Sequence, residues 1–311
     1  MTMAQWTHKH LLDLDDVSRD EIELIIETAR SFKEVSSREV KKVPALRGKT
    51  VVLLFFEPST RTRVSFELAA KRLSADTLSI AANVSSVTKG ETVLDTALNI
   101  EAMNVDAMVV RHQASGVPQI LAKGTKTVII NAGDGCRAHP TQALLDVFTM
   151  VDKIGPLDGK KVTIIGDILH SRVARSNIGA LITMGAHVTV CGPGTLIPLG
   201  MEQYGVEVTT SIDRALDGAD VVMALRMQKE RQQELYLPSM TEYIKEFCIT
   251  SERLKKAKPH ALVMHPGPMN RGVEIAANVA DGAQSVILEQ VTNGIAVRMA
   301  VLYLLLSRKT E

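Results

Sequence analysis

The fold is decided by one stretch near the start of the chain, which reads Val51-Val52-Leu53-Leu54-Phe55-Phe56-Glu57-Pro58-Ser59-Thr60-Arg61-Thr62-Arg63. Its apolar half is rich in branched and aromatic residues and is bounded by Pro58, which predicts a buried strand. A helix is expected to follow at once, capped by Ser59 or Thr60. The buried face of this helix is expected to hold Val64, Leu68 and Leu73, with Ala69 and Ala70 between them.

Four polar residues, Ser59 to Thr62, therefore lie where a strand meets the start of a helix. Free amides and the positive end of the helix dipole attract anions at such a place. The hydroxyls add donors, and the guanidinium of Arg61 matches two phosphate oxygens at once. A capped helix with surface arginines remains the alternative, because capping serines and threonines are common.

Composition limits the classes of function. The 311 residues, of which 45% are hydrophobic, suffice for two domains of ordinary size. A net charge of +1 gives no long-range field for nucleic acid or an anionic membrane. No apolar run approaches the roughly 20 residues of a membrane span, and three scattered cysteines suggest reduced, mostly buried thiols. The expected compartment is the cytoplasm, and neither a metal nor a cofactor is expected.

The first half of the chain predicts a parallel α/β sheet. Further strands are expected at Asp76–Ile80, Val105–Val110 and Thr127–Ile130, mostly separated by helical patterns, with a polar loop at Ala81–Glu91. Arg111 follows one strand, and His139 and Gln142 follow another. Ligands bind at the carboxyl ends of such strands, so these side chains are expected to share a pocket with Ser59–Thr62.

The second half predicts another doubly wound sheet after the turn residues Gly155–Gly159. Strands are expected at Val162–Asp167, His187–Cys191, Val221–Leu225 and Ala261–His265. The first turn lacks G-x-G-x-x-G, which leaves a nicotinamide or flavin cofactor unsupported. Polar residues again follow the strands, in Asp167–Arg172, Arg226–Arg231 and His265–Pro268. From composition alone, Arg226–Arg231 could be a solvated loop.

Four separated motifs together resemble the aspartate and ornithine carbamoyltransferase family. They are Ser59-Thr60-Arg61-Thr62, His139-Pro140-Thr141-Gln142, Arg226 to Arg231, and His265-Pro266-Gly267-Pro268. The resemblance covers nearly the whole chain and implies an α/β fold of two doubly wound domains, each with a mostly parallel central sheet, and an active site in the cleft between them. A carbamoyl-phosphate-binding domain would comprise residues 1–150 plus 290–311, and an aspartate-binding domain residues 151–289.

The resemblance also implies the residues of the first substrate. Those expected to bind carbamoyl phosphate are Ser59, Thr60, Arg61, Thr62, Ser85, Lys89, Arg111, His139, Gln142, Gly267 and Pro268. Those expected to be catalytic are Arg61, Thr62, Lys89, Arg111 and His139. In the family, Ser85 and Lys89 match a loop that reaches a neighbouring subunit, which implies a homotrimer with shared sites. From spacing alone, Lys89 would be a surface lysine.

The second substrate is implied by the motif around Arg226, which resembles the aspartate branch of the family. Arg172, Arg226, Gln228 and Lys89 are the expected contacts of L-aspartate. Two arginines suit a dicarboxylate, because each can make a bidentate pair. Pro266 argues against ornithine as the substrate, because ornithine carbamoyltransferases carry His-Cys-x-Pro at this turn. The Gly267-Pro268 bond is expected to be cis, and Gly267 departs from the expected Leu or Ala.

The implied reaction transfers the carbamoyl group of carbamoyl phosphate to L-aspartate by direct attack through a tetrahedral intermediate, without metal or cofactor. Whether a regulatory or dihydroorotase chain binds as a partner stays an open question. Two alternatives also stay open. A carbamoyltransferase for another amino acid or diamine would keep the first-half motifs and change Arg226–Arg231. A non-catalytic phosphate-sensing or assembly subunit would keep the fold and lose polar site residues, and none of the matched ones is missing.

Overall fold

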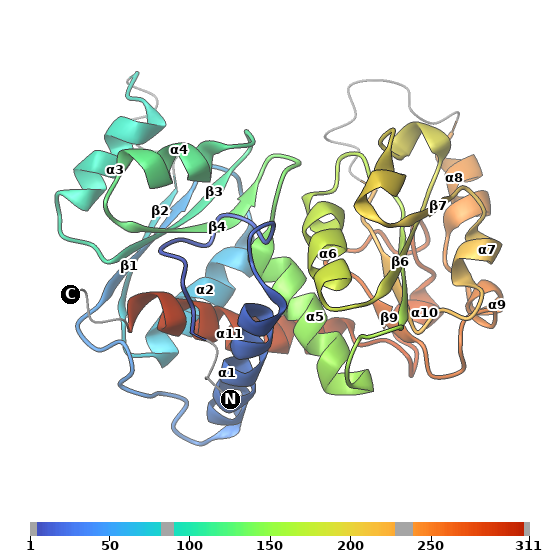
Figure 1. Cartoon of the computed structure of the whole chain (residues 1–311), viewed down its shortest axis with the longest axis horizontal. Coiled ribbons are helices and arrows are strands. Elements are labelled where there is room, and N and C mark those ends of the chain that lie inside the picture. Colours follow the sequence, from blue (N-terminus) through green and yellow to red (C-terminus); the bar gives the residue numbers. More distant parts are fainter. Residues whose placement is uncertain (1–4, 82–89, 228–238, 308–311) are drawn as a thin grey trace. The chain divides into compact units, whose positions relative to one another are not determined.

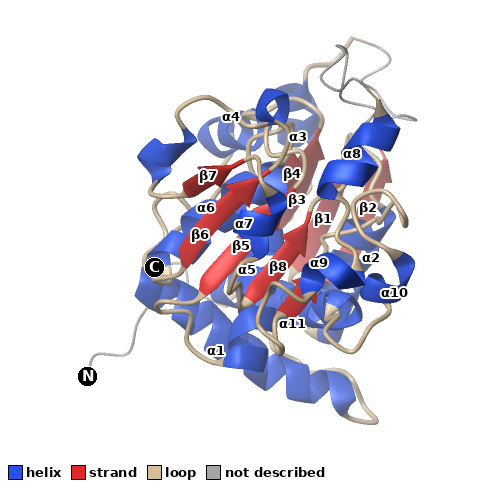
Figure 2. Cartoon of the chain, turned by 90° about the vertical axis from the view of Figure 1, so that its right-hand side faces the viewer, coloured by secondary structure: helices blue, strands red, loops and turns tan. Residues whose placement is uncertain are grey.

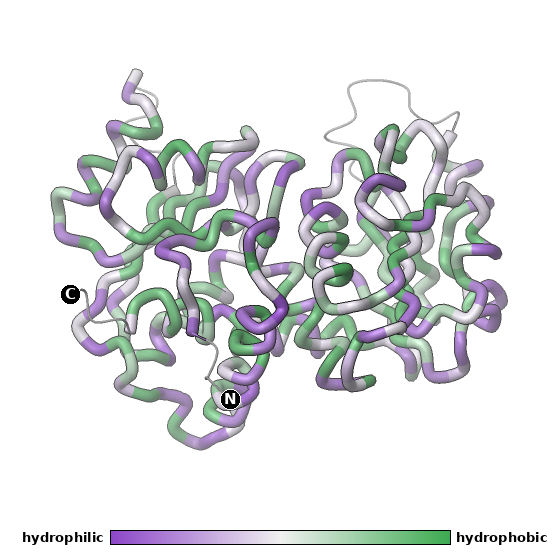
Figure 3. Tube along the Cα trace, in the orientation of Figure 1, coloured by the Kyte–Doolittle hydropathy of each residue, from purple (hydrophilic) through white to green (hydrophobic). Residues whose placement is uncertain are grey.

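The computed structural model of the chain describes residues 5–81, 90–227 and 239–307. The chain forms two compact units, residues 1–145 with 292–311 and residues 146–291. Each unit has a parallel sheet with helices on its faces, which confirms the predicted fold class (Figure 1). Figure 2 shows the strands between their helices, and Figure 3 shows hydrophobic residues along the strands of both sheets.

The first unit contains a four-stranded sheet in the order β2-β1-β3-β4, with all neighbours parallel. Its strands are β1 (Thr50–Phe55), β2 (Asp76–Ala81), β3 (Ala107–His112) and β4 (Val128–Asp134). The inner strands β1 and β3 are nearly continuous apolar runs because both of their faces are covered. Helices α3 (Val93–Glu101) and α4 (Val117–Gly124) pack on one face, against Val52, Leu54 and Met108.

Four further helices belong wholly or partly to this unit. They are α1 (Arg19–Ser37), α2 (Thr60–Arg72), α5 (Pro140–Ile154) and α11 (Ile287–Leu306). Helix α1 begins with the capping box formed by Ser18 and Glu21. Figure 1 shows α2 and α11 on the side of the sheet opposite α3 and α4. Because α5 and α11 both cross the division between the units, the chain passes from one unit to the other within helices.

The expected core face of α2 was partly wrong. Val64 and Leu68 are 41% and 38% exposed, whereas Phe66, Ala69 and Ala70 are buried together with Leu73. The buried stripe is therefore rotated by about half a turn from the one that the apolar spacing indicated. Phe66 explains the shift, because its ring is fully buried beneath the guanidinium of Arg298, whose carbon lies 5.1 Å from the ring centroid.

An N-terminal segment runs along the open edge of β4. Leu11 N donates to Ile129 O at 3.0 Å, and Asn131 N donates to Leu11 O at 2.8 Å. The Nδ1 of His10 accepts from Ile129 N at 3.0 Å. Burial, with a smaller effect of Lys9, lowers the pKa of His10 to about 4, so the imidazole is neutral and can accept this bond. The segment thereby satisfies backbone groups of an edge strand.

The second unit contains a five-stranded parallel sheet in the order β7-β6-β5-β8-β9. Its strands are β5 (Lys161–Ile165), β6 (His187–Cys191), β7 (Glu207–Thr209), β8 (Val221–Ala224) and β9 (Leu262–Met264). Its helices are α6 (Arg172–Thr183), α7 (Ile212–Leu216), α8 (Met240–Phe247), α9 (Ser251–Leu254) and α10 (Ala277–Ala280), with short 3₁₀ turns at Gly194–Leu196 and Met201–Tyr204. The short edge strand β7 was not predicted.

One hydrophobic core cluster of this unit lies between the sheet and helices α7 to α10. It includes Ile165, Val222, Val263, Leu216 and Phe247. Cys191 and Cys248 are buried free thiols and Cys136 is half-buried, and burial raises the pKa of the Cys191 thiol to about 12. No helix within the described ranges is long and apolar enough to cross a membrane.

Candidate active site

Both sheets have a topological switch point, and several predicted site residues follow the strands that flank it. In the first sheet the chain leaves β1 for β2 on one side and then for β3 on the other. Ser59–Thr62 follow β1, and Arg111 lies at the end of β3, directly opposite Phe55 of β1. Ligands of open α/β sheets bind outside the carboxyl ends of the strands at such a point. The topology thus places Ser59–Thr62 and Arg111 after neighbouring strands of the first sheet.

The first turn of α2 is arranged differently from an ordinary cap. Ser59 occupies the N-cap position with extended backbone, but its side chain makes no capping hydrogen bond. Its hydroxyl instead donates to Thr62 Oγ1 at 3.0 Å. The amides at the start of α2 are therefore not occupied by the Ser59 hydroxyl, and they can bind an anion.

Arg111 is buried, with 8% of its surface exposed, and is held by two acceptors. Its Nη1 donates to Ala132 O at 3.0 Å, and its Nη2 donates to a Glu57 carboxylate oxygen at 3.2 Å. Arg111 O in turn accepts from Phe56 N at 2.8 Å. These contacts join the ends of β1, β3 and β4 around one guanidinium, which is fixed in place before any ligand arrives.

The neighbouring His112 has a structural role. Its Nδ1 accepts from Ala114 N at 2.8 Å, and its ring centroid lies 5.1 Å from that of Phe56. Burial lowers the pKa of His112, although the carboxylates of Glu57 and Asp134 act in the opposite direction.

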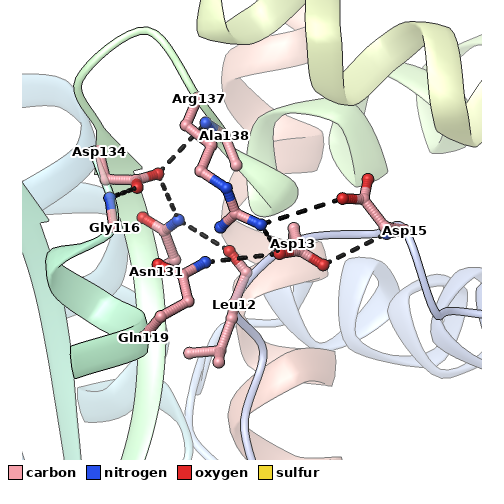
Figure 4. A network of polar contacts seen from close by, with 9 residues as sticks. All are labelled: Leu12, Asp13, Asp15, Gly116, Gln119, Asn131, Asp134, Arg137 and Ala138. Atoms are coloured by element: carbon pink, nitrogen blue, oxygen red, sulfur yellow. Dashed lines mark hydrogen bonds and ion pairs between the residues drawn. The ribbon is translucent and has the colours of Figure 1, made fainter. Parts of the chain in front are cut away.

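The loop that carries His139 is built on a buried carboxylate (Figure 4). Asp134 is fully buried and accepts hydrogen bonds from Asn131 Nδ2 at 2.8 Å, Gly116 N at 2.7 Å and Ala138 N at 3.2 Å. A buried carboxylate is tolerated only when it is well hydrogen-bonded. Its three donors therefore fix the path from β4 to His139, whose carbonyl accepts from Gln142 N at 3.0 Å at the start of α5.

The N-terminal segment supports the same loop (Figure 4). Asn131 Nδ2 also donates to Leu12 O at 2.7 Å, and Arg137 Nη2 donates to Asp13 Oδ2 at 2.8 Å. Asp15 lies 4.0 Å from the same guanidinium nitrogen. Residues 12–15 thus hold the loop from outside, while Asp134 holds it from inside.

The second sheet repeats the pattern at its own switch point. The chain leaves β5 for β6 and β7 on one side and then for β8 and β9 on the other. Arg172 begins α6 after β5 and is buried, and Arg226 follows β8 and is half-buried. Ile165 of β5 lies opposite Ala224 of β8, and Leu225 N donates to Ile165 O at 2.8 Å. The two arginines therefore follow adjacent strands of the second sheet.

The turn His265–Pro268 follows β9, next to β8. The Gly267-Pro268 bond is cis, as the motif predicted. Gly267 has φ +66°, a conformation that glycine adopts without strain, which accounts for glycine in place of a larger residue. Asn270 Nδ2 lies 3.5 Å from Met227 O, so this turn adjoins the segment that carries Arg226.

Three predicted site residues, Ser85, Lys89 and Gln228, lie outside the described residues. The other predicted residues fall into two sets. Ser59–Thr62, Arg111, His139 and Gln142 belong to the first unit, and Arg172, Arg226, Gly267 and Pro268 belong to the second.

Comparison with known proteins places the chain in a family. Residues 9–152 match the carbamoyl-P binding domain of aspartate/ornithine carbamoyltransferases, and residues 158–305 match their Asp/Orn binding domain. The chain belongs to the aspartate/ornithine carbamoyltransferase family. The resemblance inferred from the motifs is thereby confirmed, and the two family domains follow one another along the chain as the two sheets do.

Several relatives share this carbamoyltransferase architecture over almost their full length. The aspartate carbamoyltransferase catalytic subunit of Syntrophotalea carbinolica is 58% identical over 96% of this chain and 96% of its own, and that of Moorella thermoacetica is 58% identical over 96% and 97%. Among solved structures, aspartate transcarbamoylase from Trypanosoma cruzi with carbamoyl phosphate has a TM-score of 0.87 at 27% identity, covering 98% of this chain and 100% of that one. Ornithine carbamoyltransferase from Pyrococcus furiosus has a TM-score of 0.87 at 31% identity, covering 99% and 100%.

The backbone alone therefore does not separate the two branches of the family, because both fit equally well. Sequence reasoning also missed residues that hold the site. Glu57 lies in the opening motif, and Asn131 and Asp134 follow the expected strand Thr127–Ile130, but the sequence alone assigned none of the three a role. A carboxylate placed between an apolar strand and a glycine-rich turn is a signal that could have identified Asp134.

Proposed function

We propose that the chain transfers the carbamoyl group of carbamoyl phosphate to the amino group of L-aspartate, giving N-carbamoyl-L-aspartate and phosphate. The observation that carries this proposal is the position of Arg172 and Arg226 after adjacent strands at the switch point of the second sheet. Two guanidiniums match a ligand with two carboxylates, whereas an acceptor with one carboxylate and an ammonium would leave one arginine unpaired. The relatives named as aspartate carbamoyltransferases support the same choice.

The residues of the first unit would hold carbamoyl phosphate. The amides at the start of α2, with Ser59, Thr60, Arg61 and Thr62, would bind the phosphate, and Gln142 would bind the amide of the substrate. Thr62, Arg111 and His139 would donate to the carbonyl oxygen as negative charge builds on it. Preorganised donors of this kind stabilise a tetrahedral intermediate, and each can contribute a factor of about 10² or more.

The residues of the second unit would hold L-aspartate. Arg172, Arg226 and Gln228 would bind its carboxylates, and the carbonyls of the His265–Pro268 turn would accept hydrogen bonds from the substrates. The uncharged amine would then attack the carbonyl carbon, the bond to the phosphate oxygen would break, and the leaving phosphate would take the proton of the amine. Holding both substrates in place lowers the activation free energy by several kcal/mol, and by about 7 kcal/mol or more when the reacting groups are well oriented.

We further propose that the chain works as a homotrimer in the cytoplasm, at an early step of pyrimidine synthesis. Ser85 and Lys89 would reach the site of a neighbouring chain, where Lys89 would contact both substrates. The support is the match of Lys89-Gly90-Glu91 and Ser85 to the family motif.

One assay tests the activity. Purified protein is incubated with carbamoyl phosphate and either L-aspartate, L-ornithine or no acceptor, and both phosphate and the carbamoylated amino acid are measured. We expect product with aspartate alone. The Arg61→Ala variant should lose about 10²-fold in kcat, while the matched Arg63→Ala variant, altered in the next arginine of the helix, should not. Product with ornithine, or phosphate release that needs no acceptor, would contradict the proposal.

A further inference from the structure

Three buried polar side chains of the second unit, each on a different helix, lead to the backbone of the His265–Pro268 turn. They are Asn177 on α6, Asp146 on α5 and Gln290 on α11, and we call these three residues the amide relay. Asn177 Nδ2 donates to Asp146 Oδ2 at 2.9 Å, and Gln290 Nε2 donates to Asp146 Oδ1 at 2.7 Å. Gln290 Oε1 then accepts from His265 N at 3.0 Å.

The amide relay lies in the interior, where polar groups are expensive. Asp146 and Asn177 are fully buried, and Gln290 is 3% exposed. A buried carboxylate costs several kcal/mol unless hydrogen bonds compensate for the lost water. Apolar residues of similar size would fill these positions at a lower cost in folding free energy, so packing alone does not explain why these side chains are polar.

Orientation does explain it. The amide of Gln290 has one donor end and one acceptor end, and its two possible orientations have almost the same shape. Asp146 can only accept while ionised, so it forces Nε2 to face it and Oε1 to face His265 N. The carboxylate therefore determines which end of Gln290 meets the backbone at the start of the turn.

The turn is pinned from its other side by the His265 ring. His265 Nδ1 accepts from Gly267 N at 2.8 Å, so the hydrogen of the neutral ring is on Nε2, which lies 3.1 Å from Glu274 Oε1. The same carboxylate oxygen accepts from Asn270 N. Backbone amides at positions 265, 267 and 270 are thus all fixed by buried side chains, and Pro266 and Gly267 lie between them.

We propose that Gln290 and Asp146 are positioning residues for the proposed reaction. They hold the backbone of His265, and through it they aim the carbonyls of Pro266 and Gly267 at the substrates. This inference rests on the proposed function of the turn. A displacement of about 1 Å at such a position can cost up to about 10²-fold in rate, so a structurally mild change in the amide relay should have a large kinetic effect.

The chain offers a reciprocal test. Gln290→Glu keeps an acceptor for His265 N but places an oxygen against Asp146, and Asp146→Asn places an amide nitrogen against a donor. In the double variant, the new Asn at 146 can donate to the new Glu at 290 and still accept from Asn177. All three hydrogen bonds are restored, and a single negative charge is kept. The matched control is Gln284→Glu, because Gln284 donates to Ala261 O in the same unit, away from the turn.

We expect each single variant to lose about 10-fold to 10²-fold in kcat/KM for aspartate, and the double variant to recover to within about threefold of the parent. The control should keep parental kcat and KM. Single variants with parental kinetics, or a double variant as impaired as the singles, would overturn the proposal.

A second measurement does not depend on activity. Hydrogen exchange, followed by mass spectrometry on peptides covering residues 262–270, should be faster in both single variants of the ligand-free protein and should return to the parental rate in the double variant. Unchanged exchange in the single variants would contradict the positioning role, even if the parent showed no carbamoylation of aspartate. If the proposed function is wrong, the parent protein itself will form no N-carbamoyl-L-aspartate, whereas its hydrogen exchange will still differ from that of the single variants.

Discussion

The guanidinium of Arg111 donates to the carboxylate of Glu57 at 3.2 Å, and both side chains lie at the carboxyl ends of neighbouring strands. Arg111 also donates to Ala132 O, so two acceptors at different positions define the plane of the guanidinium. The planar guanidinium of arginine presents several N–H donors in fixed directions, whereas the ammonium of lysine is a compact charge without this geometry. The proposed carbonyl donor of the site is therefore oriented by the protein itself.

Arg111→Lys should lower kcat by about 10²-fold, because the hydrogens of an ammonium share one nitrogen, which cannot reach both separated acceptors and also donate to the carbonyl oxygen. Steady-state kinetics with carbamoyl phosphate and aspartate check this prediction. Arg63→Lys is the matched control, since Arg63 is exposed on α2 and should tolerate the change. Equal kcat values for the two variants would mean that Arg111 acts only as a positive charge.

Asp134→Asn should both destabilise the protein and weaken carbamoyl phosphate binding. The new amide presents hydrogens to at least one of the donors Asn131, Gly116 and Ala138, which leaves a buried group unsatisfied at a cost of about 1–3 kcal/mol. Urea unfolding and KM for carbamoyl phosphate are the measurements. Asp13→Asn breaks the outer contact with the partly exposed Arg137 and should cost less, about 1 kcal/mol at most.

The strand ends could be predicted from the sequence because they depend on local pattern. Apolar runs ending in Arg111 or Arg226 indicated buried strands, and the parallel α/β pattern then placed those side chains at one edge of each sheet. β7 was missed because Glu207–Thr209 spans three residues and lies at the sheet edge, where no continuous apolar run is needed. The face of α2 was misjudged because Val64 and Leu68 have helical spacing yet are exposed.

The supporting residues could not be predicted, because their partners are distant in the sequence. Gln290 and Asp146 are 144 positions apart, and Asn131 binds Leu12 from 119 positions away. Nothing in the local pattern around Asp146 distinguishes it from an ordinary polar residue of a helix. Buried hydrogen bonds of this kind depend on how the elements pack, which periodicity does not specify.

Glu21 should make stability depend on pH in acid. Burial alone would raise its pKa, but hydrogen bonds from Thr7 and Ser18 outweigh this effect and lower the pKa from 4.5 to about 2. The ionised form is thus favoured in the folded state, so the stabilisation is complete above about pH 4.5 and is lost as the pH falls toward 2.

Glu21→Gln should therefore lower the free energy of unfolding at pH 7 by about 2–3 kcal/mol and flatten its pH dependence between pH 4.5 and 2. Urea unfolding at several pH values measures both effects. Glu23→Gln is the matched control, because Glu23 forms an exposed pair with Arg19 and should contribute little. A parallel acid response of parent and Glu21→Gln would refute the assignment.

Arg226→Ala should chiefly raise KM for aspartate and leave KM for carbamoyl phosphate near its parental value, since Arg226 lies at the switch point of the second sheet. Losing a charged hydrogen-bonding partner of a carboxylate costs about 1.5–3 kcal/mol, or roughly 10-fold to 10²-fold. Arg271→Ala is the control, because Arg271 pairs with Asp281 at the surface of the same unit. If only the binding of carbamoyl phosphate became weaker, the assignment of Arg226 to the aspartate pocket would be wrong.

Mixing two inactive variants tests whether sites are shared between chains. If Lys89 of one chain completes the site that contains Arg111 of another, reassembled mixtures of Lys89→Ala and Arg111→Ala chains contain some sites with both native residues. Random assembly of equal amounts gives about a quarter of the sites in this state, so activity should return to about 25% of the parent. A mixture of Arg61→Ala and Arg111→Ala should stay inactive, because both changes fall in one chain's half of the site. Equal activity in the two mixtures would exclude a shared site.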